Sequence, residues 1–486
     1  MHPLNKRAKQ ALKDPVLMRT LPEATRRAVD KQRDRWRELP DVDALRDRAQ
    51  EIKHHTVRHL DHYLTTFEAA AKANGVHVHW ASTHEEAIGI IRAVLDRNDV
   101  RVVAKVKSMA TEEMALRERL EATGREVWET DLGEFIVQIS GRPPSHITAP
   151  AIHEDVASIS RLFHEKLGTP QTDDPERLAR FARDHLRDRF HQADCGISGA
   201  NFLVAETGRV VLVENEANIR LATTLPRVHV VVAGIEKVVP RTSDIPVFLK
   251  LLARSATGQK LTAYTHELRG PRRKDETEGP DEMHVVLLDA GRTRILADEA
   301  ARDTLDCIRC GACQNVCPVY QAVGGHAYGG VYGGPIGAIL RPQLEPDRDT
   351  RRLPYASTLC GACESACPVK IPIPDILLHL RSRAVASASD ERLPRPGWIA
   401  EKATVQAWYR SAMSPRVWRV GGKLARLFGP ARPGRGSFHR LPPPLSGWTK
   451  HREFPRPAPE TFHAMWDGRK KKKSAAHPIG RDEDGT

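Results

Sequence analysis

Seven of the eight cysteines in this 486-residue chain lie between positions 307 and 367. Residues 307–320 read "CIRCGACQNVCPVY", and residues 357–370 form a near-copy, "STLCGACESACPVK". The N-terminus, "MHPLNKRAKQALKDP", is charged and lacks the apolar stretch of a secretory signal, so we expect a cytoplasmic protein. In that setting, tight clustering of cysteines indicates metal ligation rather than a disulfide framework.

The first group fits the run C-x2-C-x2-C-x3-C-P, in which three closely spaced thiolates hold one [4Fe–4S] cluster and the fourth serves a second cluster. Two-residue gaps wrap the backbone around a compact cluster, whereas the fourth cysteine points away from it. In this arrangement the last cysteine of each copy binds the cluster that the other copy holds. The predicted ligands are therefore Cys307, Cys310, Cys313 and Cys367 for cluster 1, and Cys317, Cys360 and Cys363 for cluster 2.

The second copy has Ser357 where its first cysteine would stand, so cluster 2 is one thiolate short. It could be a [3Fe–4S] cluster, or a [4Fe–4S] cluster whose last iron takes Ser357, water or another group. Zinc also accepts four cysteines at such spacings, but zinc ligands usually come as separated pairs. Three cysteines within seven residues crowd one tetrahedral ion, so the pattern predicts iron–sulfur clusters.

A chain of this length is expected to form two or three folded units. Its longest apolar runs fall short of the ~20 residues of a membrane helix, so no membrane span is predicted. We expect a helical segment over 1–69, an α/β domain over 70–295, a helical iron–sulfur module over 296–385 and a Pro- and Arg-rich extension over 386–486.

Short β-rich runs alternate with amphipathic helices inside the 70–295 segment, which favours a mainly parallel sheet covered by helices. The runs lie at 76–80, 100–106, 125–130, 134–139, 201–206, 208–215 and 229–235. Gly75 is expected to end the helix before the first run, and 270–282 reads as an exposed loop.

Polar residues gather where several of these runs end, the edge at which open α/β sheets tend to bind ligands. They are Glu206, Glu214, Asn215, Glu216, Asn218 and Arg220. Arg220 or Lys107 could pair with the carboxylate of a 2-hydroxy acid. The alternative is that these groups cap helices and pair with one another at a turn.

For three further residues we expect a structural role. His146 and His153 flank a turn, and a lone histidine is more often hydrogen-bonded than catalytic. Cys195 stands apart from the other cysteines and is expected to be buried as a small apolar residue. Neither a dinucleotide-binding glycine motif nor a P-loop is visible.

The cysteine copies, together with "KSMATEE" at 107–113, "ETDLGEFIVQISGRPPSHITAPAIH" at 129–153 and the stretch 196–240, carry a family resemblance. The chain resembles the LutB or LldF family, the iron–sulfur subunit of bacterial L-lactate utilisation, from about residue 70 to 385. The resemblance implies a LUD domain, similar to the sugar-isomerase and CoA-transferase group, followed by an all-α ferredoxin-like module with two clusters. It also implies two partner subunits with which L-lactate is oxidised to pyruvate.

The leading interpretation is therefore an electron-transfer subunit, with a quinone or a flavin-bearing partner as electron acceptor and with membrane contact only through partners. One alternative is a catalytic subunit that binds a hydroxy acid at the open iron of the three-cysteine cluster. Another is a redox-sensing regulator that uses the net charge of +13 and the basic run "GRKKKK" at 468–473 to bind nucleic acid. In the leading interpretation no nucleic-acid partner is expected.

Overall fold

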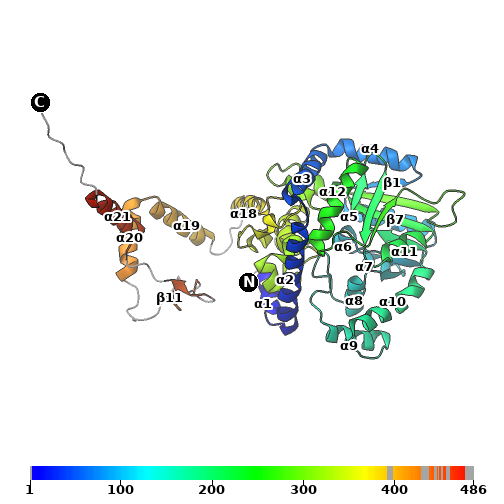
Figure 1. Ribbon diagram of the computed structural model, residues 1–486, viewed down its shortest axis with the longest axis horizontal. Coiled ribbons are helices and arrows are strands. Elements are labelled where there is room, and N and C mark those ends of the chain that lie inside the picture. The colour runs from blue at the N-terminus through cyan, green and yellow to red at the C-terminus, as the bar shows by residue number, and fades with distance from the viewer. Residues whose placement is uncertain are drawn as a thin grey trace. The chain divides into compact units, whose positions relative to one another are not determined.

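The computed structural model describes residues 3–347, 349–390, 398–427, 437–442, 446, 448, 449, 452–455 and 460–476. The chain divides into two compact units, Met1–Ser387 and Ala388–Thr486. The first unit contains the α/β sheet and both cysteine motifs, so the candidate sites lie within it (Figure 1).

A six-stranded sheet forms the centre of the α/β region, and every neighbouring pair of strands in it is parallel. Its order is β1 (His77–Ala81), β10 (Glu282–Leu288), β7 (Val228–Gly234), β4 (Cys195–Ser198), β2 (Val102–Lys105) and β3 (Glu126–Glu129). Along β7, Val230 and Val231 belong to different core clusters, one on each side of the sheet. A parallel sheet buried on both faces explains why β7 reads as a continuous apolar run.

Helices cover both faces of this sheet. One face packs against α4 (Leu60–Ala73), α8 (Leu132–Ser140), α10 (Pro175–Gln192) and α11 (Asn218–Thr224), and the other against α5 (His84–Arg97) and α7 (Leu116–Glu121). The helix α9 (Val156–Leu167) packs beside α8 and α10, and α6 (Met109–Glu113) follows β2. The predicted parallel α/β fold is thus confirmed.

The structure contains a second sheet, which has four strands. Its order is β8 (Val238–Val239), β5 (Phe202–Val204), β6 (Arg209–Glu214) and β9 (Tyr264–Leu268), with β5 and β9 both antiparallel to β6. The helix α12 (Ile245–Ala256) connects β8 to β9 and buries Phe248 against Phe202 of β5, with ring centroids 4.9 Å apart. The sequence did not predict this second sheet as a separate layer.

The run at 134–139, predicted as a strand, is helical and belongs to α8. Asp131 caps this helix by accepting a hydrogen bond from the Glu134 N–H, and Gly141 ends it in the left-handed conformation at φ 69°. Conversely, the strands β4, β9 and β10 were not predicted. Beyond the expected stop at Gly75, φ 84°, the chain turns directly into β1.

The N-terminal helices α1 (Pro3–Ala11), α2 (Pro15–Arg37) and α3 (Val42–Arg58) pack on the cysteine region (Figure 1). Arg46 of α3 donates to the Cys367 carbonyl at 2.9 Å, and Gln32 of α2 donates to the Ala366 carbonyl at 3.1 Å. Helices from one end of the chain therefore share a core with cysteines more than 300 residues away.

Between residues 302 and 390, the elements of the described residues are helices and 3-10 turns. The helices are α14 (Ala312–Asn315), α15 (Pro318–Val323), α16 (Gly334–Leu344), α17 (Ala362–Ser365) and α18 (Ile373–Asp390), with α13 (Arg292–Leu296) just before them. The loop between the cysteine motifs buries Tyr328 and Tyr332.

The second unit contains α19 (Trp398–Ala412), α20 (Pro415–Leu427), the short pair β11 (Ser437–Phe438) and β12 (Phe454–Pro455), and α21 (Phe462–Ala476). The basic run at 468–473 lies within α21. Among the described helices, none combines the length and the apolar character needed to cross a membrane.

Candidate functional site

Four cysteines from both motifs line one small, largely apolar cavity. Cys307, Cys310 and Cys313 come from the first motif, and Cys367 comes from the second. The apolar walls come from Ile147, Ile308, Ile336 and Val369, among others. The chain thus brings the four side chains predicted for cluster 1 together, although Cys367 lies 54 residues beyond Cys313 in the sequence.

The remaining three motif cysteines form a second set. Cys317 and Cys363 are buried, and Cys360 is exposed. Burial and, after it, the neighbouring Cys317 raise the pKa of the Cys363 thiol to about 12. Cys360 likewise raises the pKa of Cys317, after the larger effect of burial.

The chemistry of the first set fits a metal cluster. Burial raises the pKa of the Cys313 thiol well above its usual range, and Cys307, Cys310 and Cys367 raise it further. Four such thiols resist ionising together unless positive charge compensates them, which bound iron would supply.

Backbone N–H groups point at sulfurs of both sets. The Arg309 N–H donates to Cys307 Sγ at 3.4 Å, and the Ile371 N–H donates to Cys367 Sγ at 3.4 Å. In the second set, the Tyr320 N–H donates to Cys317 Sγ at 3.5 Å. Hydrogen bonds to ligand sulfurs are one of the means by which proteins set cluster potentials.

The two motifs also share a backbone path. Arg309 and Leu359 occupy equivalent positions and both have positive φ, 63° and 56°. The glycines that follow, Gly311 and Gly361, have φ of 76° and 81°, and each begins a four-residue helix, α14 and α17. A Cβ at Gly311 would approach the His146 ring to 3.1 Å, so both conformation and space favour glycine there.

A larger cavity of ≈ 390 Å³ opens at the carboxyl ends of β2, β4 and β7. Of the predicted polar residues, Lys107, Glu214, Asn215, Glu216 and Asn218 line it, but Glu206 and Arg220 do not.

The two residues outside the cavity have other partners. Glu206 accepts a hydrogen bond from the Thr242 N–H at 2.8 Å, and the Arg220 guanidinium lies over the Tyr264 ring, 5.0 Å from its centroid.

Glu214 and Asn215 are already engaged by neighbouring protein groups. The Glu214 carboxylate accepts from the Ile219 N–H and from His266 Nε2, both at 2.6 Å. The Asn215 side chain exchanges two hydrogen bonds with Gln259, each of 3.1 Å. The arrangement matches the alternative noted from the sequence, in which these groups hold a turn and the start of α11.

An ion-pair network joins this cavity to the first cysteine motif. Arg292 contacts Glu236 at 2.6 Å and Glu113 at 2.8 Å, and Arg309, between Cys307 and Cys310, contacts Glu236 at 3.1 Å. The network is nearly sealed from water, because the side chains of both carboxylates and of Arg292 are at most 2% exposed. Pairing with Arg292 overcomes the opposing effect of burial and lowers the pKa of Glu113 to about 2.

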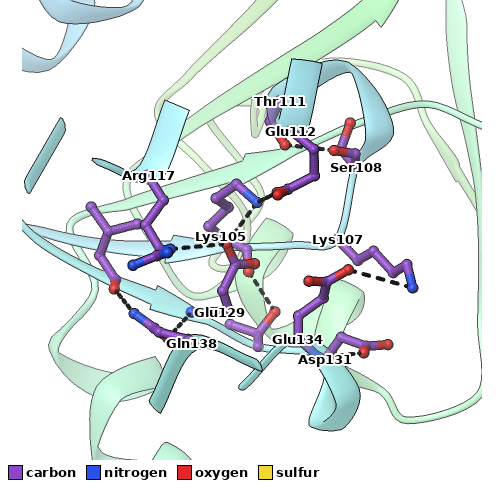
Figure 2. Close-up of polar contacts among 12 residues, drawn as sticks. Lys105, Lys107, Ser108, Thr111, Glu112, Arg117, Glu129, Asp131, Glu134 and Gln138 are labelled. Carbon is purple, nitrogen blue, oxygen red and sulfur yellow. Dashed lines mark hydrogen bonds and ion pairs between the residues drawn. The ribbon is translucent and has the colours of Figure 1, made fainter. Parts of the chain in front are cut away.

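A second charged network lies beside the cavity, and Figure 2 shows Lys105 reaching Glu112 and Glu129. The Lys105 ammonium is buried 2.7 Å from Glu112 and 2.8 Å from Glu129. Burial alone would lower the pKa of Lys105, but these carboxylates raise it, so the amine is charged. Figure 2 also shows the contact between Lys107 and Glu134, whose charged groups lie 3.4 Å apart.

The residues for which a structural role was expected are buried. His146 Nε2 lies 3.1 Å from Asn315 Oδ1 of the cysteine region, and His153 Nδ1 lies 2.7 Å from the Ser145 hydroxyl. Cys195 is fully buried on β4.

The sequence did not single out Lys237, Glu236, Arg292 or Arg309. The available signal was position, since Glu236 and Lys237 directly follow the apolar run that became β7, at the ligand-binding edge of a parallel sheet. No spacing rule connects that edge with Arg309.

Three family descriptions match successive parts of the chain. They are the LUD domain over residues 64–288, the 4Fe-4S dicluster domain over residues 303–371, and Lactate utilisation protein B, C-terminal, over residues 380–471. The dicluster match supports iron–sulfur binding by the region that contains both cysteine sets. A solved structure of a DUF162 family protein from Deinococcus radiodurans aligns with 47% of the chain at 16% identity and a TM-score of 0.27.

Curated relatives align along nearly the whole chain. A Lactate utilization protein B from Macrococcus caseolyticus is 43% identical over 96% of this chain and 96% of its own length. A protein of the same name from Shouchella clausii is 42% identical over 96% of this chain and 97% of its own. One from Bacillus licheniformis is 43% identical over 90% of both chains. The chain therefore belongs to the lactate utilization protein B family, an iron–sulfur family that serves lactate utilisation.

Proposed function

We propose that this chain is the electron-transfer subunit of an L-lactate-oxidising complex. Its all-α module would hold one cluster through Cys307, Cys310, Cys313 and Cys367, and a second through Cys317, Cys360 and Cys363, with Ser357 near the fourth corner. When bound, iron–sulfur clusters supply one-electron storage and transfer.

The observation that carries the proposal is the sorting of the seven cysteines into two sets, each of which draws on both motifs. Crossed ligation of this kind is typical of proteins with two neighbouring iron–sulfur clusters. A single structural zinc site would need only four of the seven thiols.

The two sets differ in their access to solvent, which supports different roles. The cavity of the first set adjoins the α/β domain through Ile147 and Arg309, whereas Cys360 of the second set is exposed. We place electron entry at the first set and exit at the second. Oxidation of L-lactate to pyruvate releases two electrons and two protons, and two other subunits would complete the complex, with a quinone or a flavin-bearing partner as acceptor.

The test is anaerobic mixing of L-lactate with the assembled complex, followed by rapid freezing and electron paramagnetic resonance. Lactate should reduce the clusters of this subunit within the turnover time of the complex. A matched complex with Cys367→Ser should form pyruvate more slowly and leave the cluster 1 signal absent. If pyruvate forms at full rate while the clusters of the unmodified subunit stay oxidised, the chain is no electron carrier.

A further inference from the structure

The cavity at the sheet edge contains hydrogen-bond donors that the protein itself does not use. Among the described residues, the Lys237 ammonium has neither a hydrogen bond nor an ion pair within 4 Å, although it lines the cavity. The Lys107 ammonium also lines the cavity. Among the described residues it has no hydrogen-bond partner, and its one ion pair is the 3.4 Å contact to Glu134. Lys237 is half-buried, whereas the Lys107 ammonium is buried, and a buried cation without a close partner is costly unless a ligand compensates it.

Ser108 supplies a third donor. Its side chain does not cap the helix α6 that follows it and makes no hydrogen bond within the described ranges. The Oγ atom lies toward Gly199, at the end of β4, where an added Cβ would come within 2.5 Å of it. Glycine at this position therefore allows the Ser108 side chain to pack against the end of β4, where both residues line the cavity.

The charges at this end of the cavity do not balance. Arg292 and Arg309 are neutralised by the buried carboxylates of Glu113 and Glu236, which leaves the Lys237 charge in excess. Burial and the neighbouring Arg309 lower the pKa of Lys237 to about 8, as expected for an amine among cations. An anion placed beside Lys237 would balance the excess positive charge and would raise the pKa of Lys237 again.

Carboxylates line the same cavity at Asp131 and Glu216. Each already accepts one backbone hydrogen bond, from Glu134 N–H at 3.1 Å and from Leu132 N–H at 3.0 Å, and each has a second oxygen with no hydrogen bond in the described structure. The cavity thus combines donors suited to an anion with acceptors suited to a hydroxyl group.

We propose that this cavity binds a small 2-hydroxy carboxylate, with Lys237 and Lys107 on the carboxylate and Ser108 on the 2-hydroxyl group. The cavity volume of ≈ 390 Å³ exceeds a three-carbon acid, so ordered water would fill the rest. The choice of a 2-hydroxy acid rests on the proposed function, whereas the anion site rests on the unpaired donors. Neither Arg220 nor Glu206 takes part, because neither lines the cavity.

The site also lies next to the first cysteine set. Glu236 is the residue before Lys237, and its carboxylate pairs with Arg309, whose N–H donates to Cys307 Sγ. A ligand bound at Lys237 would therefore alter the charge felt by cluster 1, which gives a spectroscopic measure of binding that does not require turnover.

The test is calorimetric titration of the isolated, cluster-loaded subunit with L-lactate and, separately, with propionate, which lacks only the hydroxyl group. Lys237→Met should weaken both ligands at least about ten-fold, since it removes a charge-assisted contact. Ser108→Ala should weaken L-lactate but leave propionate unchanged. Lys250→Met, at an exposed position of α12 outside the cavity, is the matched control and should bind like the unmodified protein.

Cluster absorbance of each variant establishes that it is folded and loaded, and L-lactate should shift the cluster 1 resonance in the unmodified protein but not in Lys237→Met. If L-lactate fails to bind the loaded subunit, or binds Lys237→Met as tightly as the unmodified protein, the site is refuted. If binding depends on Lys237 while lactate leaves the clusters oxidised in the assembled complex, the site stands and the electron-transfer proposal fails.

Discussion

Ser357 Oγ stands in the second motif where Cys307 Sγ stands in the first, and each accepts a hydrogen bond from the backbone N–H two residues later. The Leu359 N–H lies 3.1 Å from Ser357 Oγ, and the Arg309 N–H lies 3.4 Å from Cys307 Sγ. The serine hydroxyl is thus oriented as a ligand sulfur would be, on a backbone with the same left-handed residue.

This equivalence predicts that Ser357 decides the iron count of cluster 2. Ser357→Cys should give a four-iron cluster with four thiolates, and Ser357→Ala should increase the three-iron resonance of the protein as isolated, because one ligand is lost. Electron paramagnetic resonance at low temperature measures both. Ser365→Ala, at an exposed position of α17, is the control, and an unaltered spectrum for Ser357→Ala would show that the hydroxyl is not used.

Crossed ligation predicts which substitutions share a phenotype. Cys367→Ser should remove the same resonance as Cys310→Ser, and Cys317→Ser the same resonance as Cys363→Ser, since each pair belongs to one set. Iron analysis and resonance spectra of the four variants measure this. Loss of one signal by Cys363→Ser and Cys367→Ser together would mean that each motif holds its own metal.

Lys105 should matter more for stability than its position at the end of a strand suggests. Lys105→Met would leave the buried Glu129 with only the 4.0 Å contact to Arg117 and would remove the 2.7 Å partner of Glu112, at a cost of about 3–5 kcal/mol in the free energy of unfolding. A lower urea midpoint would report the loss.

Two further variants separate charge from packing in that experiment. Adding Glu129→Gln to Lys105→Met should recover part of the stability, because the buried carboxylate that lost its closest cation is gone. Lys166→Met, on the exposed side of α9, should leave the midpoint within about 0.5 kcal/mol of the original. Equal midpoints for Lys105→Met and Lys166→Met would contradict the role of the buried pair.

The burial of His229 predicts how the stability of the protein changes at acidic pH. Burial lowers its pKa to about 3 on β7, where Nε2 lies 2.8 Å from the Ser198 hydroxyl. In the unfolded chain this histidine binds a proton below about pH 6.5, whereas in the folded chain it stays neutral down to about pH 3. The free energy of unfolding therefore falls as the pH drops from about 6.5 toward 3, by up to about 1.4 kcal/mol per pH unit. Above pH 6.5 this group has no effect.

The measurement is the thermal midpoint at pH 7.5 and pH 5.0. His229→Gln should show a smaller decrease between the two values than the unmodified protein, since glutamine does not titrate. His62→Gln, at an exposed position, should show the original decrease. If His229→Gln and the unmodified protein lose stability equally, His229 is already protonated in the folded state.

Sequence reasoning succeeded where a pattern encodes the chemistry. The alternation of apolar runs and amphipathic helices predicted the parallel α/β fold, because periodicity reports directly which faces are buried. The cysteine spacing predicted iron–sulfur binding in the same way, and the matched dicluster domain supports it.

The errors arose where a pattern is ambiguous or where distant segments meet. The run at 134–139, with four apolar residues among its six, suits a buried strand or a buried helix equally, and the cap at Asp131 with Gly141 decided for the helix. Arg220 was one of two candidates for pairing with a substrate carboxylate, and its guanidinium lies over the Tyr264 ring. Lys237 and Arg309 are 72 positions apart in the sequence, but they line one cavity in the structure, where Arg309 pairs with Glu236.

The decisive measurement is the metal content of the purified protein. Protein purified without oxygen should contain iron and acid-labile sulfide, and after reduction with dithionite it should show two iron–sulfur resonances. A colourless preparation that contains zinc, with neither iron nor sulfide, would contradict the electron-transfer role.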